Sequence, residues 1–229
     1  MTVIKSERHD VVQTWMYHSD LFGGMACMLA GFKQVFWNVR NTKIPQNGLS
    51  ITLLIIKLCA IMSRVLPKRI ICCAYSAMED HIKLGYKEEK MQVIPNGYDT
   101  RNRIISKKQV NMIKKRYNIE KNLFIVGIVA RFDALKGYNN FVKAAKIIEE
   151  RSSRKILFVM VGRNINHDNK ELASLTKNFG GSATFKFFGE IKNVFEVMSV
   201  FDVFCLASKA EGFPNVVAEA MLVGKPCVV

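Results

Sequence analysis

Short apolar runs alternate with longer mixed stretches of polar and apolar residues along most of the chain. Residues 122–130 form a nearly continuous apolar run, and further runs follow at 155–161, 183–188 and 201–207. A continuous apolar strand is typical of a parallel sheet that helices cover on both faces. The stretches between the runs suit helices, so repeated strand–helix units predict an α/β fold with parallel sheets.

The first hundred residues predict a shorter series of the same units. Strands are expected at residues 11–16, 34–39, 69–74 and 91–94. Helices are expected from Gly23-Gly24 to about Ala30, at 50–66 and at 76–86. Ser76 followed by Glu79 has the spacing of a helix capping box. Pro95-Asn96-Gly97 is a turn signal that ends the last strand.

A change of composition separates the two series. Residues 101–121 contain eight basic residues and one acidic residue, and they are expected to include a surface helix at 107–117. The sequence therefore predicts a first unit at residues 1–100, a basic connecting segment at 101–121 and a second unit at 122–229. The first unit has few strands for a doubly wound sheet, and the chain ends inside the apolar run Cys227-Val228-Val229. Both observations lead to the hypothesis that the chain is a fragment of a truncated or split gene.

The composition is that of a folded protein with a strong basic excess. Of the 229 residues, 49% are hydrophobic and 23% are charged, which excludes a disordered tail or a fibrous repeat. The formal net charge of +15 favours contact with anions such as phosphates, nucleotides, acidic lipids or nucleic acid. A nucleic-acid-binding surface would interleave basic with exposed aromatic residues, whereas most aromatic residues here lie in the apolar strands. We therefore expect no nucleic acid partner.

Cysteine usage and hydropathy bear on the cellular compartment. The six cysteines include no CxxC pair and do not suggest a disulfide framework, which favours a reducing cytoplasm. The first residues lack the apolar stretch of a signal peptide. The longest apolar segment, residues 51–62, contains Lys57 and is shorter than the roughly twenty residues that a membrane span needs. The sequence therefore predicts a cytoplasmic protein without a transmembrane helix.

Two cations follow the apolar run at 122–130. Arg131 comes directly after it, and Lys136 precedes Gly137 and a helix expected at 138–150. Ligands of open α/β sheets bind at the carboxyl ends of the strands, so two cations five residues apart at that edge are suited to grip a diphosphate. The alternative is that both are solvated residues of a surface loop, because such pairs are common on basic proteins. Position alone leaves both interpretations open.

A second group of polar residues follows the run at 201–207. Glu211 and Gly212 lie in the loop after it, Pro214 suits the first turn of the next helix, and Glu219 falls in the second turn. Glycine lets the backbone approach a ligand closely, and a helix N-terminus favours phosphate or developing negative charge. A carboxylate held nearby accepts hydroxyl donors from a ribose or a hexose. The alternative is an acidic residue at a helix start together with a solvated glutamate.

Taken together, these segments resemble the donor domain of family 4 glycosyltransferases, the glycosyltransferase group 1 family with the GT-B fold. The strongest match is Glu211-Gly212-Phe213-Pro214 with Glu219-Ala220-Met221, the EX7E signature of that family. Other matches in this half are residues 126–131, Lys136-Gly137, Phe188-Gly189 and residues 201–208. In the first half, residues 14–21, 74–76 and 93–99 resemble parts of the acceptor domain. The resemblance covers nearly the whole chain.

The resemblance implies two Rossmann-like parallel-sheet domains facing a cleft, both incomplete here, with the acceptor side in residues 1–100 and the donor side in 122–229. It implies a retaining transfer from a nucleotide-diphospho-sugar to a glycan or polyprenyl-linked acceptor in surface polysaccharide assembly. The family needs no metal and no cofactor, which agrees with the absence of a DxD motif from the sequence. The alternative is a nucleotide-sugar-binding remnant that does not catalyse transfer.

The resemblance also assigns roles to individual residues. Arg131 and Lys136 would hold the donor diphosphate and stabilise it as it leaves. Glu211 would orient the donor sugar or act as a nucleophile, and the sequence leaves these two roles open. The residues implied to bind the donor are Glu219, on the ribose, with Gly212, Phe213, Pro214 and Asn215.

The acceptor side departs from the family pattern. Many members carry a histidine after the strand that matches residues 36–39, whereas Arg40-Asn41 stand there in this chain. His18 lies on a neighbouring strand-end loop and is the acceptor-side candidate. The alternative is that His18 is an ordinary polar loop residue.

A stretch without acidic residues raises the question of a membrane contact. Between Asp20 and Glu79 there are seven basic residues and no acidic residue, and the helix expected at 50–66 mixes apolar residues with Lys57 and Arg64. One interpretation is that this face docks on the anionic inner face of the cytoplasmic membrane and meets a lipid-linked acceptor. The alternative, which the pattern favours, is a core helix with solvated ends.

Overall fold

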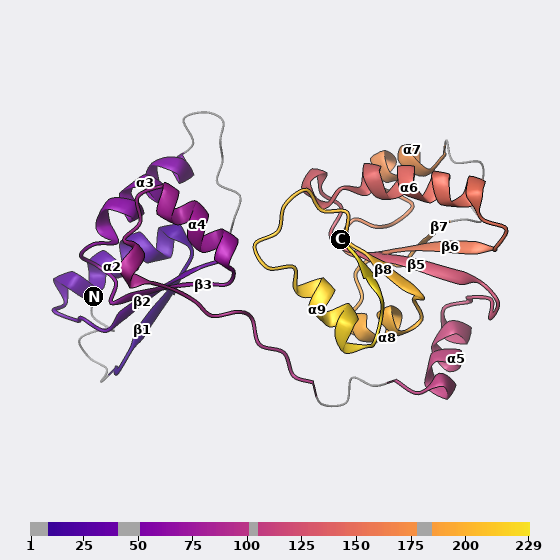
Figure 1. The fold of residues 1–229 in the computed structure, drawn as a ribbon, viewed down its shortest axis with the longest axis horizontal. Coiled ribbons are helices and arrows are strands. Elements are labelled where there is room, and N and C mark those ends of the chain that lie inside the picture. Colours follow the sequence, from indigo (N-terminus) through magenta and orange to yellow (C-terminus); the bar gives the residue numbers. More distant parts are fainter. Residues whose placement is uncertain (1–8, 41–50, 101–104, 178–184) are drawn as a thin grey trace. The chain divides into compact units, whose positions relative to one another are not determined.

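The chain forms two compact α/β units, each built on one parallel sheet (Figure 1). The computed structural model describes residues 9–40, 51–100, 105–177 and 185–229. One unit comprises Met1–Gly97 with Glu211–Phe213, and the other comprises Tyr98–Ala210 with Pro214–Val229. The predicted α/β class with parallel sheets is confirmed.

The first unit is a four-stranded parallel sheet in chain order. Its strands are β1 (Val12–Trp15), β2 (Val35–Val39), β3 (Arg69–Cys72) and β4 (Met91–Val93). Its helices are α2 (Tyr17–Leu29), α3 (Ile51–Met62), α4 (Tyr75–Lys83) and the short 3-10 helix η1 (Glu88–Lys90). Figure 1 shows α2, α3 and α4 on one face of the sheet, and the fully buried side chains of Trp37 and Ile70 belong to the core on that face.

The prediction that Gly23-Gly24 opens the first helix is wrong, because both glycines lie inside α2. A Cβ atom on Gly24 would lie 3.1 Å from Nε1 of Trp37, and one on Gly23 would lie 2.8 Å from Cγ2 of Thr14. The glycines therefore let the helix pack closely on β1 and β2. Packing against the sheet outweighs the cost of glycine in a helix interior, which is only about 0.5–1 kcal/mol relative to alanine.

The predicted capping box at Ser76 and Glu79 is also wrong. Helix α4 follows Ala74, and no side chain caps it. A capping box instead begins α5 (Lys107–Arg116) in the second unit. There Oγ of Ser106 accepts a hydrogen bond from the Gln109 N–H at 3.3 Å, and Oε1 of Gln109 accepts one from the Ser106 N–H at 2.9 Å.

The second unit is a five-stranded parallel sheet in the order β7-β6-β5-β8-β9. Its strands are β5 (Phe124–Val129), β6 (Ile156–Val161), β7 (Phe185–Phe187), β8 (Val203–Cys205) and β9 (Cys227–Val228). Its further helices are η2 (Ala134–Lys136), α6 (Tyr138–Arg151), α7 (Lys170–Lys177), α8 (Val194–Ser199) and α9 (Asn215–Leu222). Helices cover both faces of this sheet, with α6 and α7 on one face and α5, α8 and α9 on the other (Figure 1).

The side chains of the central strands alternate between two apolar cores. Ile125 and Val159 belong to the core beneath α8 and α9, whereas Ile128 and Met160 belong to the core beneath α6. This alternation explains why the run at 122–130 is apolar at successive positions, as expected for a strand buried on both faces.

A buried carboxyl group stands in the first turn of α2. Asp20 is 1% exposed, and its Oδ1 accepts a hydrogen bond from Oγ1 of Thr14 at 2.5 Å. Burial raises the pKa of Asp20 to about 7, although the hydrogen bonds from Thr14 and from the backbone of Asn38 act in the opposite direction. Compared with the unfolded chain, the folded state therefore favours the protonated form of the Asp20 carboxyl group.

The replacement Asp20→Asn is expected to remove part of the pH dependence of stability. In the unfolded chain Asp20 ionises near pH 4, whereas in the folded chain it ionises near pH 7. The contribution of the protonated carboxyl group to stability is therefore full below about pH 4 and is lost as the pH rises towards 7. The unfolding free energy of the variant minus that of the wild type should increase by roughly 1–3 kcal/mol as the pH rises from about 5 to 8. Urea denaturation at several pH values measures this change. The exposed Asp10→Asn variant is the control, and a constant difference for Asp20→Asn across that range would contradict the prediction.

Candidate donor-binding site

The second unit places two cations in one short loop after β5. The strand ends with the Ala130 N–H donating to the Val161 carbonyl at 2.9 Å, and Arg131 follows with an exposed side chain. Nε of Arg131 lies 3.3 Å from Oδ2 of Asp133. Both side chains are partly exposed, so this ion pair contributes little to stability but restricts the position of the guanidinium group.

Asp133 organises the rest of this loop. Its Oδ1 accepts a hydrogen bond from the Leu135 N–H at 2.9 Å and so caps the 3-10 helix η2, which ends at Lys136. The Leu135 N–H, together with the nearby charges of Arg131 and Lys136, holds the pKa of Asp133 below its ordinary value. The structure thus places Arg131, Asp133 and Lys136 in one short loop, where both cations favour the ionised form of the Asp133 carboxyl group.

At Gly137 the backbone of this loop packs closely against the segment after β8. The φ of Gly137, 67°, lies in the left-handed region, and a Cβ atom there would lie 1.8 Å from the carbonyl oxygen of Ala207. The Lys209 N–H also donates to the Leu135 carbonyl at 2.8 Å. Only glycine permits this approach, so the loops after β5 and β8 are held against each other at the carboxyl edge of the sheet.

The end of β6 meets the same edge. Gly162 has a φ of 142°, and a Cβ atom there would lie 2.0 Å from the Ala130 carbonyl oxygen. The Gly162 N–H donates to the Gly189 carbonyl at 2.7 Å, and Oη of Tyr138 donates to the Ala130 carbonyl at 2.6 Å. Close backbone contacts therefore hold both ends of the loop from Arg131 to Gly137, which we call the cation loop.

Helix α9 carries Glu219, and Pro214 is its N-cap residue. Oη of Tyr98 donates to Oδ1 of Asn215 at 2.7 Å. Burial and then the charge of Glu219 raise the pKa of Tyr98 above its ordinary value. Tyr98 was not among the predicted site residues. The one signal for it in the sequence is its place in the turn segment that follows β4.

Glu211, Gly212 and Phe213 lie in the loop between β8 and α9, and they group with the other unit. Their roles in orienting the donor sugar therefore stay predictions. The residues that the second unit itself holds together are those of the cation loop and those after β8.

On the first unit, His18 and Arg40 follow two neighbouring strands. His18 is exposed in the first turn of α2, directly after β1. Arg40 follows β2, where its Nε donates to Oδ1 of Asn38 at 2.6 Å and its guanidinium group also bonds to Oδ1 of Asn96. The guanidinium carbon lies 4.7 Å from the ring centroid of Trp15. Two side-chain amides and an aromatic ring thus hold Arg40 in place. The sequence showed Arg40 only as a departure from the family pattern and did not predict these contacts.

Solved structures of similar fold include glycosyltransferases. The chain matches Anabaena Alr3699/HepE, solved in complex with UDP and glucose, with a TM-score of 0.84 and 21% identity over all of this chain and 61% of that one. It matches WaaG, a glycosyltransferase involved in lipopolysaccharide biosynthesis, with a TM-score of 0.72 and 16% identity over 99% and 60% of the two chains. These identities show the fold alone, and that fold is the GT-B fold of glycosyltransferases.

The sequence of the second unit, with part of the connecting segment, shows which protein family the chain belongs to. Residues 109–229 match the family model described as Glycosyl transferases group 1, and the chain belongs to this family. It is 28% identical to the UDP-Gal:alpha-D-GlcNAc-diphosphoundecaprenol alpha-1,3-galactosyltransferase of Escherichia coli, over 99% of this chain and 59% of that enzyme. It is 30% identical to the N,N'-diacetylbacillosaminyl-diphospho-undecaprenol alpha-1,3-N-acetylgalactosaminyltransferase of Campylobacter jejuni, over 64% of this chain and 38% of that enzyme. The chain thus spans less than two thirds of the length of these relatives.

Proposed function

We propose that this chain acts as a retaining glycosyltransferase that moves a sugar from a nucleotide-diphospho-sugar to a glycan or polyprenyl-linked acceptor in surface polysaccharide assembly. The observation that carries the proposal is the loop from Arg131 to Gly137, which contains Arg131, Asp133 and Lys136 at the carboxyl edge of the second sheet. That edge is where open α/β sheets bind nucleotides. The names of the two relatives specify acceptors linked to diphosphoundecaprenol, and the first specifies UDP-galactose as donor.

The cation loop binds the donor diphosphate in this proposal. Arg131 forms paired hydrogen bonds with two phosphate oxygens through its planar guanidinium group, and Lys136 adds a compact point charge. Negative charge grows on the diphosphate as the bond to the sugar breaks. Two preorganised cations stabilise that charge more strongly than they stabilise the bound donor, which is the condition for a faster reaction. Because they neutralise the leaving group, we propose that transfer needs no metal ion and no cofactor.

The transfer itself exchanges two bonds at the anomeric carbon. The bond from this carbon to the phosphate oxygen breaks, and the acceptor hydroxyl oxygen bonds to the same carbon with retention of configuration. The proton of the acceptor hydroxyl ends on the released diphosphate or on a carboxylate. Glu211 orients the sugar or serves as the nucleophile of a double displacement, and Glu219 accepts hydrogen bonds from the ribose.

The acceptor binds on the first unit in this proposal, near His18 and Arg40. The fixed guanidinium group of Arg40 suits the diphosphate of a lipid-linked acceptor. Such acceptors lie in a membrane, so we propose that the protein works in the cytoplasm and contacts the inner face of the cytoplasmic membrane.

Calorimetric titration with UDP, GDP and ADP tests the proposal and selects the donor nucleotide. We expect one nucleoside diphosphate to bind in the presence of EDTA. Assays with the matching nucleotide sugars and a prenyl-diphosphate-linked sugar then test transfer, and NMR of the product gives the anomeric configuration. Binding without transfer would favour the non-catalytic remnant, and an inverted product would contradict the retaining mechanism. Failure to bind any of the three nucleotides would overturn the assignment of the site.

A further inference from the structure

Helix α3 is apolar on two opposite sides. Ile55, Ile56, Cys59 and Ala60 are buried in the core of the first unit. A second apolar stripe, spaced every three or four residues, faces outward along α3 and the turn after it. It consists of Ile51, Leu54, Leu58, Ile61 and Val65, with exposed fractions from 39% at Leu58 to 76% at Ile51. An apolar side of a helix is normally covered, so the exposed stripe indicates a binding partner.

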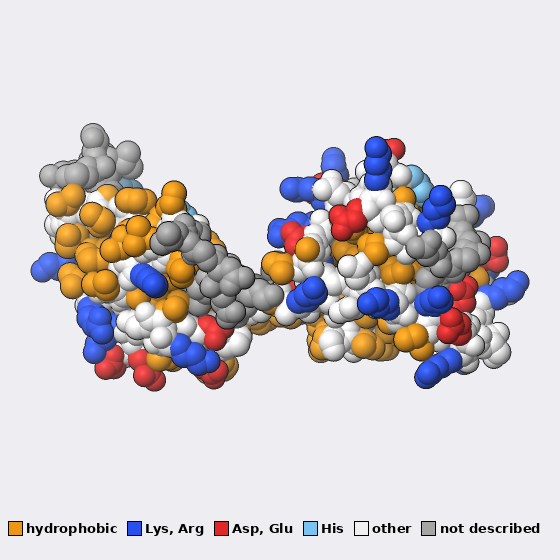
Figure 2. Space-filling model, turned by 90° about the horizontal axis from the view of Figure 1, so that it is seen from above, with side chains coloured by type: hydrophobic (Ala, Val, Ile, Leu, Met, Phe, Trp, Pro, Cys, Tyr) orange, Lys and Arg blue, Asp and Glu red, His pale blue; other side chains and the backbone are white. Residues whose placement is uncertain are grey.

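Helix α2 extends the exposed apolar surface. It packs beside α3, and its outward side chains are Phe22, Met25, Met28 and Leu29. We call these side chains and the α3 stripe together the α2–α3 face. Figure 2 shows hydrophobic side chains gathered over the helices of the first unit, with Lys and Arg side chains beside them. Contiguous apolar patches of this kind mark interaction sites. The alternative of a core helix with solvated ends therefore does not describe α3.

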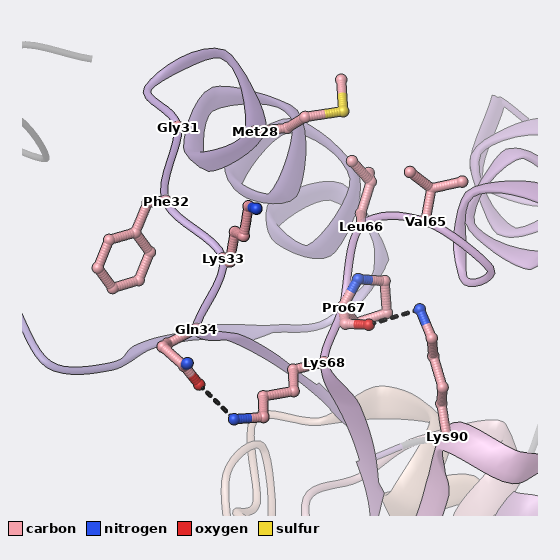
Figure 3. A pocket seen from close by; sticks show the side chains of 10 residues that line it. All are labelled: Met28, Gly31, Phe32, Lys33, Gln34, Val65, Leu66, Pro67, Lys68 and Lys90. Atoms are coloured by element: carbon pink, nitrogen blue, oxygen red, sulfur yellow. Dashed lines mark hydrogen bonds between the residues drawn. The ribbon is translucent and has the colours of Figure 1, made fainter.

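A pocket adjoins this face at the amino ends of the strands. It has a volume of about 570 Å³ and shares Met28 and Val65 with the α2–α3 face. Figure 3 shows Lys33, Lys68 and Lys90 around it. Lys68 and Lys90 immediately precede β3 and β4, and Lys33 lies two residues before β2, so the pocket lies at the edge opposite to the one where substrates of α/β sheets bind.

Lys68 and Lys90 in the pocket are held by neutral oxygen atoms. Nζ of Lys90 donates to the Pro67 carbonyl oxygen at 2.8 Å, and Nζ of Lys68 donates to Oε1 of Gln34 at 2.7 Å (Figure 3). Nζ of Lys90 also donates to the Arg64 carbonyl oxygen at 2.7 Å. These bonds position the ammonium groups but do not neutralise them. An anion with an apolar tail would meet the lysines and the apolar wall of Met28, Val65 and Leu66 at the same time.

The charge around the face decides which partner fits. No Asp or Glu occurs from Leu21 to Met78, and Lys57 and Arg64 lie on and just after α3. A second copy of this chain would bring like charges together, whereas an anionic lipid surface is complementary to them. None of the described helices combines the length and apolar character needed to cross a bilayer. With twelve residues α3 is about 18 Å long, against a hydrocarbon core of about 30 Å, and so it is suited to lie in the membrane plane.

We propose that the α2–α3 face and the adjoining pocket form a docking site for a bilayer that contains anionic phospholipid. The apolar side chains of the face enter the interface of the bilayer, and Lys33, Lys68 and Lys90 bind the phosphate of one acidic headgroup. This site specifies the membrane contact of the proposed function, and it makes no use of the donor-binding loop.

Sedimentation with phosphatidylcholine vesicles, with and without phosphatidylglycerol, tests the docking site. We expect binding only when phosphatidylglycerol is present. The double variants Leu54→Gln/Ile61→Gln and Lys33→Gln/Lys68→Gln should each lower the partition coefficient about tenfold or more. Matched controls on the second unit are Ile147→Gln, which removes an exposed apolar side chain of α6, and Lys107→Gln/Lys108→Gln, which removes two charges from α5. The controls should stay within about twofold of the wild type.

Three outcomes would overturn the docking site. One is equal binding to vesicles with and without phosphatidylglycerol. Another is an equal loss in the control variants, which would mean that the net charge of the chain alone drives binding. The third is sedimentation velocity showing a dimer that Leu54→Gln/Ile61→Gln dissociates, which would assign the face to a second copy. Nucleotide titration of the same variants separates this test from the proposed function, because face variants should bind nucleotide as the wild type does.

Discussion

Replacing Lys136 by Gln is expected to lower the rate of sugar transfer by about 10²–10³-fold. Lys136 ends η2, in the loop whose two cations flank Asp133. In the proposed mechanism its ammonium group acts on charge that appears on the diphosphate only as the sugar leaves. An interaction made mainly in the transition state changes kcat more than KM. Initial rates over a range of nucleotide-sugar concentrations should therefore show a large fall in kcat and a much smaller change in KM.

Two other variants make this prediction specific. Lys146→Gln removes the same charge from an exposed position of α6 and should leave the rate near that of the wild type. Arg131→Lys keeps the charge but loses the planar fork, so its rate should lie between those of the wild type and Lys136→Gln. Wild-type turnover by the Lys136→Gln variant would contradict the assignment of the cation loop to the diphosphate.

The second sheet could be predicted well from the sequence because its strands are buried on both faces. The expected strand at 155–161 corresponds to β6 at Ile156–Val161, whose side chains alternate between two cores. An apolar residue is needed at nearly every position of such a strand, so its signal is continuous. Arg131 and Lys136 could be placed in one loop for the same reason, because the end of β5 is unambiguous.

Local signals failed where tertiary packing determines the residue. Gly23 and Gly24 have the composition of a helix boundary, but they serve the contact of α2 with Thr14 and Trp37. Ser76 has the right type and spacing for a cap, yet α4 already begins at Tyr75. In both cases the deciding partner belongs to another element, and local sequence patterns carry no information about it.

Hydrogen bonds between residues far apart in the sequence could not be predicted for the same physical reason. Arg40 bonds to Asn96 across 56 residues, and Tyr98 bonds to Asn215 across 117 residues. No spacing rule links positions so far apart, because the two residues of each pair meet only after the chain has folded. The sequence therefore indicated which residues are unusual at each strand end, but not which of them hold one another in place.

Replacing Gly137 by Ala is expected to destabilise the second unit by about 3 kcal/mol or more and to weaken nucleotide binding together with it. The variant must adopt a left-handed φ and place a methyl group 1.8 Å from the Ala207 carbonyl oxygen, so the loops after β5 and β8 must separate. Gly224→Ala is the matched control, because Gly224 has a φ of 72° but no atom within 4 Å of the added Cβ. It should cost only the dihedral strain, about 1–2 kcal/mol. Urea denaturation followed by circular dichroism measures both variants, and hydrogen exchange of the β5 amides assigns the loss to the second unit. An equal loss in the two variants would mean that close packing against Ala207 is not the reason for glycine at position 137.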